Sequence, residues 1–215
     1  MDFAKQELRT PRLLLRPWRR QDLDLMARWP AFTEPLDQIW NWPQRLQVEG
    51  SLDLFFRSHA SDPARAAWTI LEGGTVAGLL QLKQIRRVER DAELGIALGA
   101  PWVGRGYGRE ALAAFLPFYF GPAGFKTIRL EVALANGRAH RLYTRLGFGE
   151  SARFWRHVGP VEEYGFLEQE EYAAVRSYFR RTGGGIYQVY VEMHLHADEY
   201  ALATTRQAAA GDPVV

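Results

Sequence analysis

A short apolar segment, a glycine-rich turn and an amphipathic segment follow one another between residues 91 and 120, and this order constrains the fold more than any other feature. The apolar run Asp91–Leu98 ends just before Pro101, and glycines follow at positions 104, 106 and 108. The next segment carries apolar residues at the i, i+3, i+4 and i+7 spacing of a helix face, namely Leu112, Phe115, Leu116 and Tyr119. The sequence therefore predicts a strand that passes through a glycine-rich turn into a helix.

Such a turn has the properties of a phosphate-binding loop. Glycines let the backbone come close to a ligand, and the free N–H groups of a helix's first turn attract phosphate oxygens. We therefore expect a pyrophosphate cradle, and the residues that would form it are Val103, Gly104, Arg105, Gly106, Tyr107, Gly108 and Arg109. A tight turn that binds nothing is the alternative. Two common nucleotide loops are disfavoured, because the dinucleotide fingerprint needs a glycine at Arg109 and no Gly-Lys-Ser/Thr tripeptide occurs.

Two segments in sequence resemble the acetyl-coenzyme A-binding core of the GNAT superfamily of N-acetyltransferases. They are 93–112 and 136–148, and the segment 10–18 is similar to the family's usual opening. The branch most similar to this chain contains the ribosomal-protein alanine acetyltransferases. The resemblance implies an α/β fold of the α+β type, with a mixed, mostly antiparallel central sheet flanked by helices and splayed around the cofactor. It also implies acetyl-CoA as the cosubstrate.

The resemblance also implies roles for individual residues. Glu93 would be the catalytic base and Tyr143 the proton donor to the departing thiolate. The pantetheine arm would be held by Asn136 and by the backbone of Ile96, Ala97 and Leu98. An edge carboxylate at position 93 and a packing role for Tyr143 are the alternatives. The chain departs from the family pattern at Val103, where glutamine or arginine is usual, and at Ala139, where serine is usual; each change removes one side-chain contact.

Three tryptophans stand among prolines in the segment 29–43, which favours a rigid aromatic loop. In the resembled family this region borders the acceptor cleft, so the candidates for substrate contact are Trp29, Trp40 and Trp42. The alternative is that these rings cap the core.

Composition limits the chemistry and the partners. The chain has no cysteine, which excludes a cysteine nucleophile and thiolate metal sites and favours direct transfer in a ternary complex. His194 and His196 alternate on one predicted strand without a clear third ligand, so no metal site is expected. A net charge of +2 does not favour nucleic acid as a partner. The polar start and the lack of a long apolar run lead us to expect a cytoplasmic protein without a membrane partner.

We expect a single GNAT-like domain over 1–205, with an insertion at 156–185 that covers the cleft or forms a homodimer contact, and a flexible tail at 206–215. Within the insertion, the pattern of 168–181 predicts a helix. After the insertion, the β-forming segment 186–195 predicts the final strand of the sheet.

The expected function is the transfer of an acetyl group from acetyl-CoA to a primary amine, either a protein N-terminus or a small molecule such as a polyamine or an aminoglycoside. An α-amine of pKa near 8 is neutral about one time in ten at pH 7, whereas a lysine-like amine of pKa about 10.4 is almost always charged. A weak base therefore suits an α-amine better. The departures at Val103 and Ala139 leave open a non-catalytic, acyl-CoA-binding regulatory protein.

Overall fold

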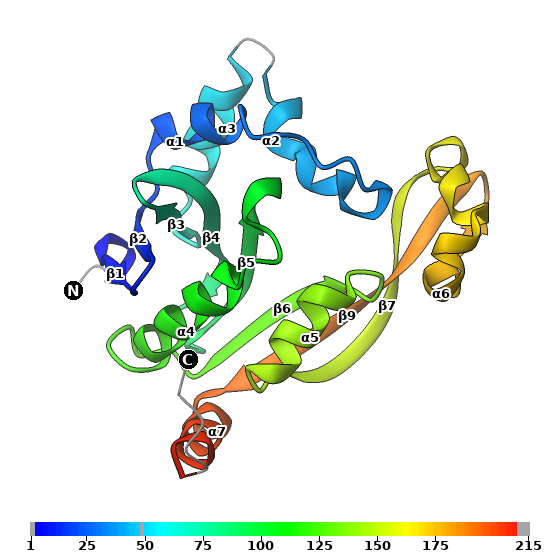
Figure 1. Ribbon diagram of the computed structural model, residues 1–215. Coiled ribbons are helices and arrows are strands. Elements are labelled where there is room, and N and C mark those ends of the chain that lie inside the picture. Colours follow the sequence, from blue (N-terminus) through cyan, green and yellow to red (C-terminus); the bar gives the residue numbers. More distant parts are fainter. Residues whose placement is uncertain (1–2, 48–49, 210–215) are drawn as a thin grey trace. The chain divides into compact units, whose positions relative to one another are not determined.

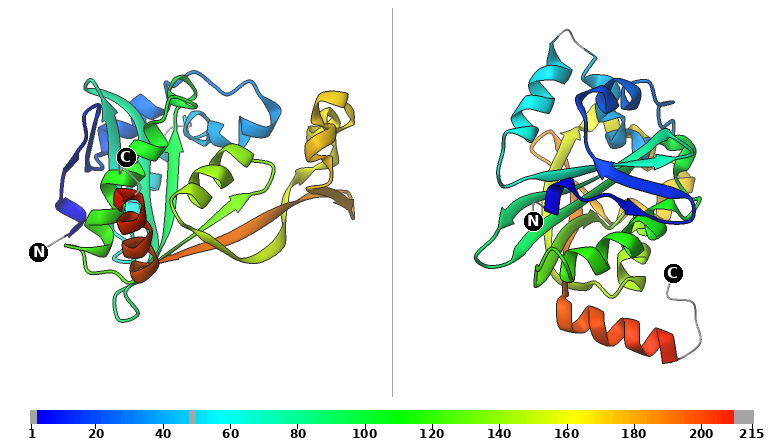
Figure 2. Two further views of the ribbon diagram at one scale, coloured as in Figure 1. Left: turned by 60° about the horizontal axis from the view of Figure 1, so that its bottom comes forward. Right: turned by 90° about the vertical axis from the view of Figure 1, so that its left-hand side faces the viewer.

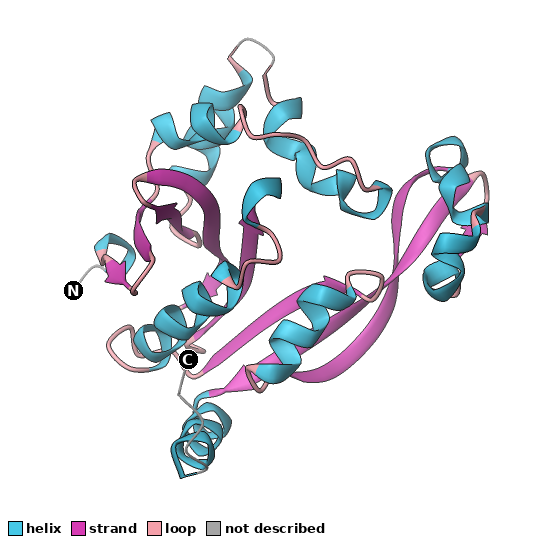
Figure 3. Ribbon diagram, viewed as in Figure 1, coloured by secondary structure: helices cyan, strands magenta, loops and turns pink. Residues whose placement is uncertain are grey.

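The computed structural model describes residues 3–47 and 50–209, and it has the predicted mixed α/β fold, with a mostly antiparallel sheet and flanking helices (Figures 1 and 3). Contacts divide the chain into two compact units: unit 1 contains 1–128 and 196–215, and unit 2 contains 129–195. Whether 1–205 acts as one domain stays a prediction. None of the described helices has the length and hydropathy that crossing a bilayer requires.

Five strands form the sheet of unit 1, and each pairs antiparallel with the next along the chain. A two-residue turn at Gly73 and Gly74 joins the third and fourth, and their φ angles of 56° and 86° suit the right-handed twist of the hairpin. The strands are β1 (Leu8–Arg9), β2 (Leu13–Pro17), β3 (Ala66–Glu72), β4 (Thr75–Arg86) and β5 (Asp91–Leu98).

Helices cover both faces of these strands, as Figure 2 shows in its right-hand view. On β3, Ala67 packs against the cluster that contains Leu23 and Met26, whereas the ring of Trp68 lies 5.2 Å from that of Phe115. Successive residues of a strand point to opposite faces, so two layers of core result. The helices of unit 1 are η1 (Phe3–Lys5), α1 (Arg20–Met26), η2 (Pro35–Asn41), α2 (Trp42–Arg45), α3 (Ser51–Ala60), η3 (Ala100–Trp102), α4 (Tyr107–Phe120) and α7 (Ala197–Ala209).

A buried ion pair fixes the junction of β2 with α1. Both terminal nitrogens of Arg16 donate to the carboxylate of Asp22, at 2.7 and 2.6 Å, and the Thr69 hydroxyl donates to it at 2.6 Å. The backbone N–H of Arg19 adds a fourth bond at 2.9 Å, so Asp22 also closes the first turn of α1. Burial alone would raise the pKa of Asp22, but the hydrogen bonds outweigh it and lower that pKa.

In unit 2 the strand β9 lies between β6 and β7, and β8 also pairs with β9. The β7–β9 ladder runs from Gly149 opposite His194 to Pro160 opposite Gly185, so the two strands pair along nearly their whole lengths. The elements are β6 (Thr127–Ala133), α5 (Gly137–Arg145), β7 (Gly149–Pro160), η4 (Val161–Glu168), η5 (Glu170–Tyr172), α6 (Ala173–Arg176), β8 (Phe179–Thr182) and β9 (Gly185–His196).

The helix predicted over 168–181 is wrong. Only Ala173–Arg176 is α-helical, and Phe179–Thr182 is strand β8 instead. Gly183 and Gly184 have φ angles of 58° and 80°, so they form a hairpin turn that pairs β8 with β9, and this pairing overrides the local helix pattern. The predicted final strand at 186–195 is confirmed as β9.

The segment expected as an insertion at 156–185 begins within β7 and ends at the start of β9. Its status as an insertion stays a prediction. The tail expected at 206–215 requires a correction, because α7 continues to Ala209 through an alanine-rich sequence that strongly favours helix. Residues 210–215 lie outside the described part of the chain.

Candidate active site

The predicted strand, turn and helix are present in unit 1. Strand β5 ends at Leu98, the loop follows, and α4 begins at Tyr107. Gly104 and Gly106 have φ angles of 78° and 83°, which residues other than glycine rarely adopt. Gly106 is the N-cap of α4 and no side chain caps the helix there. The first N–H groups of α4 therefore remain suited to bind an anion.

Side chains around this loop contribute unequally. Arg109 is exposed, as is Arg105, whose Nη1 donates to the carbonyl of Pro101 at 3.4 Å. Val103 is half-buried. Tyr107 is 5% exposed and its hydroxyl donates to Glu72 at 3.1 Å, so its side chain anchors the start of α4. Only its backbone is then a candidate for ligand binding.

Two residues that sequence reasoning missed, Arg12 and Glu110, meet beside this loop. The backbone N–H and the Nε of Arg12 donate to the Glu110 carboxylate at 3.0 and 2.6 Å. Thr10 donates to the same carboxylate at 2.5 Å. Burial would raise the pKa of Glu110, but the hydrogen bonds from Thr10 and Arg12 outweigh it and lower that pKa. The residues are about a hundred positions apart, so no local pattern could have revealed the contact.

Glu93 is a buried carboxylate, 8% exposed, on β5. Strand alternation places it on the same face as Gly95 and Ala97. Its Oε1 forms an ion pair with the Nζ of Lys83, the residue opposite it on β4. Lys83 is a third residue that the sequence analysis missed. This ion pair engages Oε1, which leaves Oε2 for the role of base that the family resemblance implies.

Gly95, two residues after Glu93, has little room for a side chain. A Cβ built on Gly95 would lie 3.1 Å from Cγ and Nε2 of Gln81, its partner on β4. The backbone candidates for pantetheine contact continue along β5, opposite β4 residues 78–80, and they are Ile96, Ala97 and Leu98. All three are half-buried.

The three tryptophans differ in exposure. Trp29 is 8% exposed, its N–H donates to the carbonyl of Val76 at 2.9 Å, and its ring lies 6.1 Å from that of Trp102, so it belongs to the core. Trp42 packs 5.2 Å from the ring of Phe55. Trp40 is 37% exposed. Trp40 therefore has the most free surface for an acceptor, and substrate contact by any of the three stays a prediction.

Asn136 and Tyr143 belong to unit 2 and share helix α5 and its cap. The Oδ1 of Asn136 accepts a hydrogen bond from the N–H of Ala139 at 3.1 Å, so Asn136 is the N-cap of α5. Because the cap uses only this oxygen, the Nδ2 group is left to donate elsewhere. Capping and ligand binding by this side chain are thus compatible.

Tyr143 is 8% exposed, and its ring lies 5.7 Å from that of Phe148. Burial raises the pKa of its phenol to about 12, because the charged phenolate would lose its solvation. The group therefore keeps its proton and acts best as a hydrogen-bond donor. Glu93 lies in unit 1, so the two catalytic candidates come from different units.

His194 and His196, which the sequence analysis considered as metal ligands, contact protein side chains instead. His194 lies 3.4 Å from Glu192, and His196 shares a hydrogen bond of 3.0 Å with Thr127. Among residues 3–47 and 50–209, no group of three or more histidine, aspartate or glutamate side chains could hold a metal ion.

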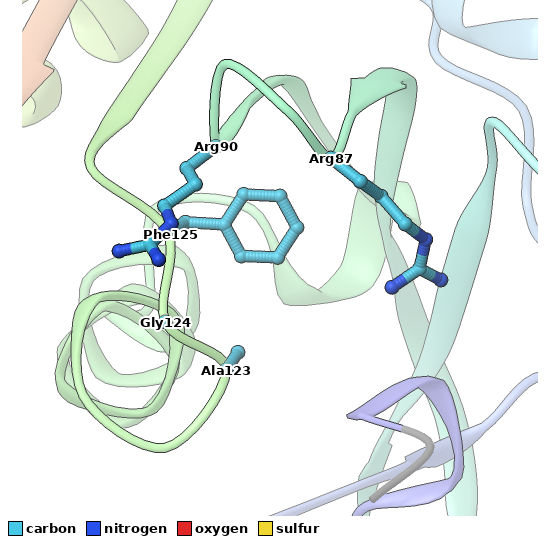
Figure 4. A pocket seen from close by; sticks show the side chains of 5 residues that line it. All are labelled: Arg87, Arg90, Ala123, Gly124 and Phe125. Carbon is cyan, nitrogen blue, oxygen red and sulfur yellow. The ribbon is translucent and has the colours of Figure 1, made fainter.

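A hollow of about 300 Å³ lies at the other end of β5 from the glycine loop. Arg87 and Arg90 line it, and Figure 4 shows the ring of Phe125 between their side chains. The Arg87 guanidinium lies 5.1 Å from the ring centre of Phe3. This hollow is not continuous with the loop at 103–109.

Comparison with known proteins identifies the family. The acetyltransferase (GNAT) domain matches residues 12–149, which is more than half of the chain. The spermidine N(1)-acetyltransferase of Escherichia coli strain K12 is 28% identical over 134 residues, or 62% of this chain and 71% of that enzyme. The enzyme of the same name from Vibrio cholerae is 26% identical over 142 residues, or 66% and 72%.

A solved structure shows the same fold. The spermidine N-acetyltransferase from Vibrio cholerae in complex with CoA and spermine has a TM-score of 0.65 and 21% sequence identity, and it covers 89% of this chain and 99% of its own. At that identity the likeness establishes the architecture alone. The matched domain leads to one conclusion: the chain belongs to the GNAT acetyltransferase family and is an acetyl-CoA-dependent N-acetyltransferase.

Proposed function

We propose that this protein acetylates a primary amine by direct transfer within a ternary complex. The diphosphate of acetyl-CoA binds the loop 103–109 through backbone N–H groups, with Arg105 and Arg109 as cationic partners. The pantetheine arm pairs with the backbone of 96–98 and takes a hydrogen bond from Asn136. The uncapped start of α4 and the left-handed glycines that precede it support this assignment.

The reaction balances with Glu93 as the base and with the amine as the source of the proton that the sulfur takes. The protonated amine gives one proton to Oε2 of Glu93, and its nitrogen then attacks the thioester carbonyl. A C–N bond forms, the C–S bond breaks, and the second proton of the former ammonium ends on the sulfur. The products are the amide, CoA thiol and one proton, which Glu93 returns to water. No acyl-enzyme forms, consistent with a chain that has no cysteine.

The observation that carries the proposal is the position of Glu93. It is a buried carboxylate on the strand that leads into the loop, two residues before Gly95. Gly95 and Ala97 add no bulky side chain to the face that carries Glu93, and the Gln81 side chain also lies on that face. A base must lie within hydrogen-bond reach of the amine that it deprotonates, and a position beside the thioester satisfies that demand.

Tyr143 stabilises the leaving thiolate mainly as a donor. A phenol of pKa about 12 and a thiol of pKa near 8.5 differ by about 3.5 units, so complete proton transfer from the phenol is uphill by about 5 kcal/mol. A hydrogen bond from the phenol to the sulfur lowers the barrier without that cost, because the phenol keeps its proton.

The first acceptor class is a polyamine of the spermidine type, supported by the activity for which the two relatives above are named. A protein N-terminus, the substrate class of the ribosomal-protein alanine acetyltransferase branch, is the second candidate. It is favoured by the Lys83–Glu93 ion pair, which is neutral as a whole and gives a polycation no net attraction. An α-amine also needs less help from a base.

The test is CoA release from acetyl-CoA with spermidine and with a peptide that begins with alanine, compared between wild type, Glu93→Gln and the exposed control Glu89→Gln. We expect Glu93→Gln to lower kcat by about a hundredfold or more with the preferred amine, as expected for loss of a general base, and Glu89→Gln to match wild type. Equal kcat in all three proteins would show that Glu93 is not the base. Release with the peptide alone would assign the second acceptor class.

A further inference from the structure

The turn that joins β1 to β2 lies against the glycine loop through one side chain, that of Arg12. Besides its bonds to Glu110, the guanidinium of Arg12 donates from Nη1 to the backbone carbonyl of Arg105 at 3.3 Å. Its Nη2 lies 2.5 Å from Oε2 of Glu110 and 3.5 Å from the point where a Cβ on Gly106 would stand. The guanidinium carbon also lies 4.4 Å from the centre of the Tyr107 ring.

These contacts hold both sides of the loop-to-helix junction. The carbonyl of Arg105 precedes Gly106, whose left-handed conformation turns the chain into α4. Glu110 lies one helical turn further on, and its backbone N–H bonds to the carbonyl of Gly106 at 3.0 Å. Arg12 therefore links the last loop residue before the cap to the first turn after it, which is the stretch whose N–H groups bind the diphosphate in the proposed site.

The partners of Glu110 favour a fixed arrangement. Its carboxylate accepts from the Thr10 hydroxyl, from the Arg12 backbone and from the Arg12 side chain. The Glu110 side chain is 15% exposed and that of Arg12 is 46% exposed. A planar guanidinium that makes several charge-assisted bonds and stacks on an aromatic ring is held more firmly than a lysine would be.

We propose that Arg12, paired with Glu110, is a positioning residue that holds the loop 104–106 in the conformation that binds the diphosphate of acetyl-CoA. It acts through the carbonyl of Arg105 and the ring of Tyr107 and does not itself contact the phosphates. This inference rests on the proposed assignment of 103–109 as the cradle.

A simpler electrostatic scheme makes the opposite prediction for Glu110. If Arg12 contacted the phosphates directly, neutralising Glu110 would free the guanidinium and remove a negative charge from the start of α4, so CoA would bind more tightly. If Arg12 acts through the loop, Glu110→Gln loosens the pair and CoA binds more weakly. The sign of the change in CoA affinity thus separates the two schemes.

The experiment compares kcat/KM for acetyl-CoA and for acetyl-pantetheine, a donor that lacks the diphosphate. The proteins are wild type, Arg12→Gln, Arg12→Lys, Glu110→Gln and the control Arg9→Gln. Arg9 lies on the neighbouring strand with a side chain that is 72% exposed, so its replacement should change nothing. Thermal unfolding of each variant confirms that it is folded, and calorimetry gives its Kd for CoA.

We expect Arg12→Gln and Glu110→Gln to lower kcat/KM for acetyl-CoA by about tenfold or more, the amount that follows from losing charge-assisted hydrogen bonds. The loss should appear in KM rather than kcat, acetyl-pantetheine should be unaffected, and Arg12→Lys should fall between Arg12→Gln and wild type. Equal losses with both donors, unchanged use of acetyl-CoA, or tighter CoA binding by Glu110→Gln would each overturn the proposal.

Failure of the cradle assignment has a different signature. In that case Gly106→Trp, which fills the turn itself, would bind CoA as well as wild type does. If Gly106→Trp abolishes CoA binding while Arg12→Gln leaves it unchanged, the cradle stands and the positioning role of Arg12 is wrong.

Discussion

Replacing Tyr143 by phenylalanine tests how the thiolate is stabilised. The ring packs against Phe148 and is 8% exposed, so Tyr143→Phe keeps the packing and removes only the hydroxyl. A hydrogen bond to a charged group contributes about 1.5–3 kcal/mol, which corresponds to a loss of about ten- to a hundredfold in kcat. The effect on KM for acetyl-CoA should be small, because the thiolate forms only as the reaction proceeds.

The pH dependence sharpens this test. With a pKa of about 12, the phenol of Tyr143 stays protonated throughout the range from pH 7 to pH 10. The pH profiles of kcat for wild type and Tyr143→Phe should therefore have the same shape up to pH 10 and differ by a constant factor. Stopped assays of CoA thiol release across this range provide the measurement, with Tyr178→Phe as the control. An alkaline decrease centred near pH 10 that is present in wild type and missing in Tyr143→Phe would refute the reasoning.

Three further predictions concern the loop, the cap and the buried ion pair. Gly106→Ala should lower the free energy of unfolding by about 1–2 kcal/mol, because Gly106 has a left-handed backbone, and it should weaken CoA binding about five- to thirtyfold in calorimetry. The control Gly74→Ala, with a similar φ, should lower only the melting temperature. Equal CoA affinities of the two variants would contradict this. Asn136→Asp keeps the capping oxygen, so it should preserve stability while weakening CoA binding. Asn136→Ala should weaken CoA binding and also lower stability by about 1 kcal/mol, because it removes the cap. Unchanged CoA affinity in Asn136→Asp would exclude the proposed contact. Asp22→Asn should cost about 3–5 kcal/mol in denaturant unfolding, because it leaves Arg16 buried without its partner. Since the folded-state pKa of Asp22 is lowered, its contribution is present above its unfolded-state pKa of about 3.9 and is lost as the pH falls toward the lower folded-state value; a variant whose acid unfolding matches wild type would argue against this.

Local patterns predicted the turn and the helix that carry the loop of the candidate site. The glycines of 104–108 and the apolar periodicity of 112–119 define the turn and the helix, and Asn136 has the side chain and position of an N-cap. These features depend on neighbours in sequence, so backbone preferences and capping chemistry suffice to predict them.

Contacts that depend on tertiary structure could not be predicted. Arg12 meets Glu110 across 98 positions, and the packing of α4 against β1 and β2 brings them together. The register of the β4–β5 hairpin brings Lys83 to Glu93, but an irregularity between Lys83 and Arg86 prevents a simple count from the turn. The segment 179–182 has a helical pattern, yet its pairing with β9 decides its structure.

The central claim, that the loop 103–109 binds the diphosphate of acetyl-CoA, is tested most directly by a thermal-shift titration of wild type and Gly106→Trp with acetyl-CoA. At about a hundred times its Kd, the ligand should add about 2.7 kcal/mol of stability to wild type. Gly106→Trp should remain folded in the absence of ligand and show no shift. The same shift in both proteins would contradict the assignment and place the cofactor elsewhere on the chain.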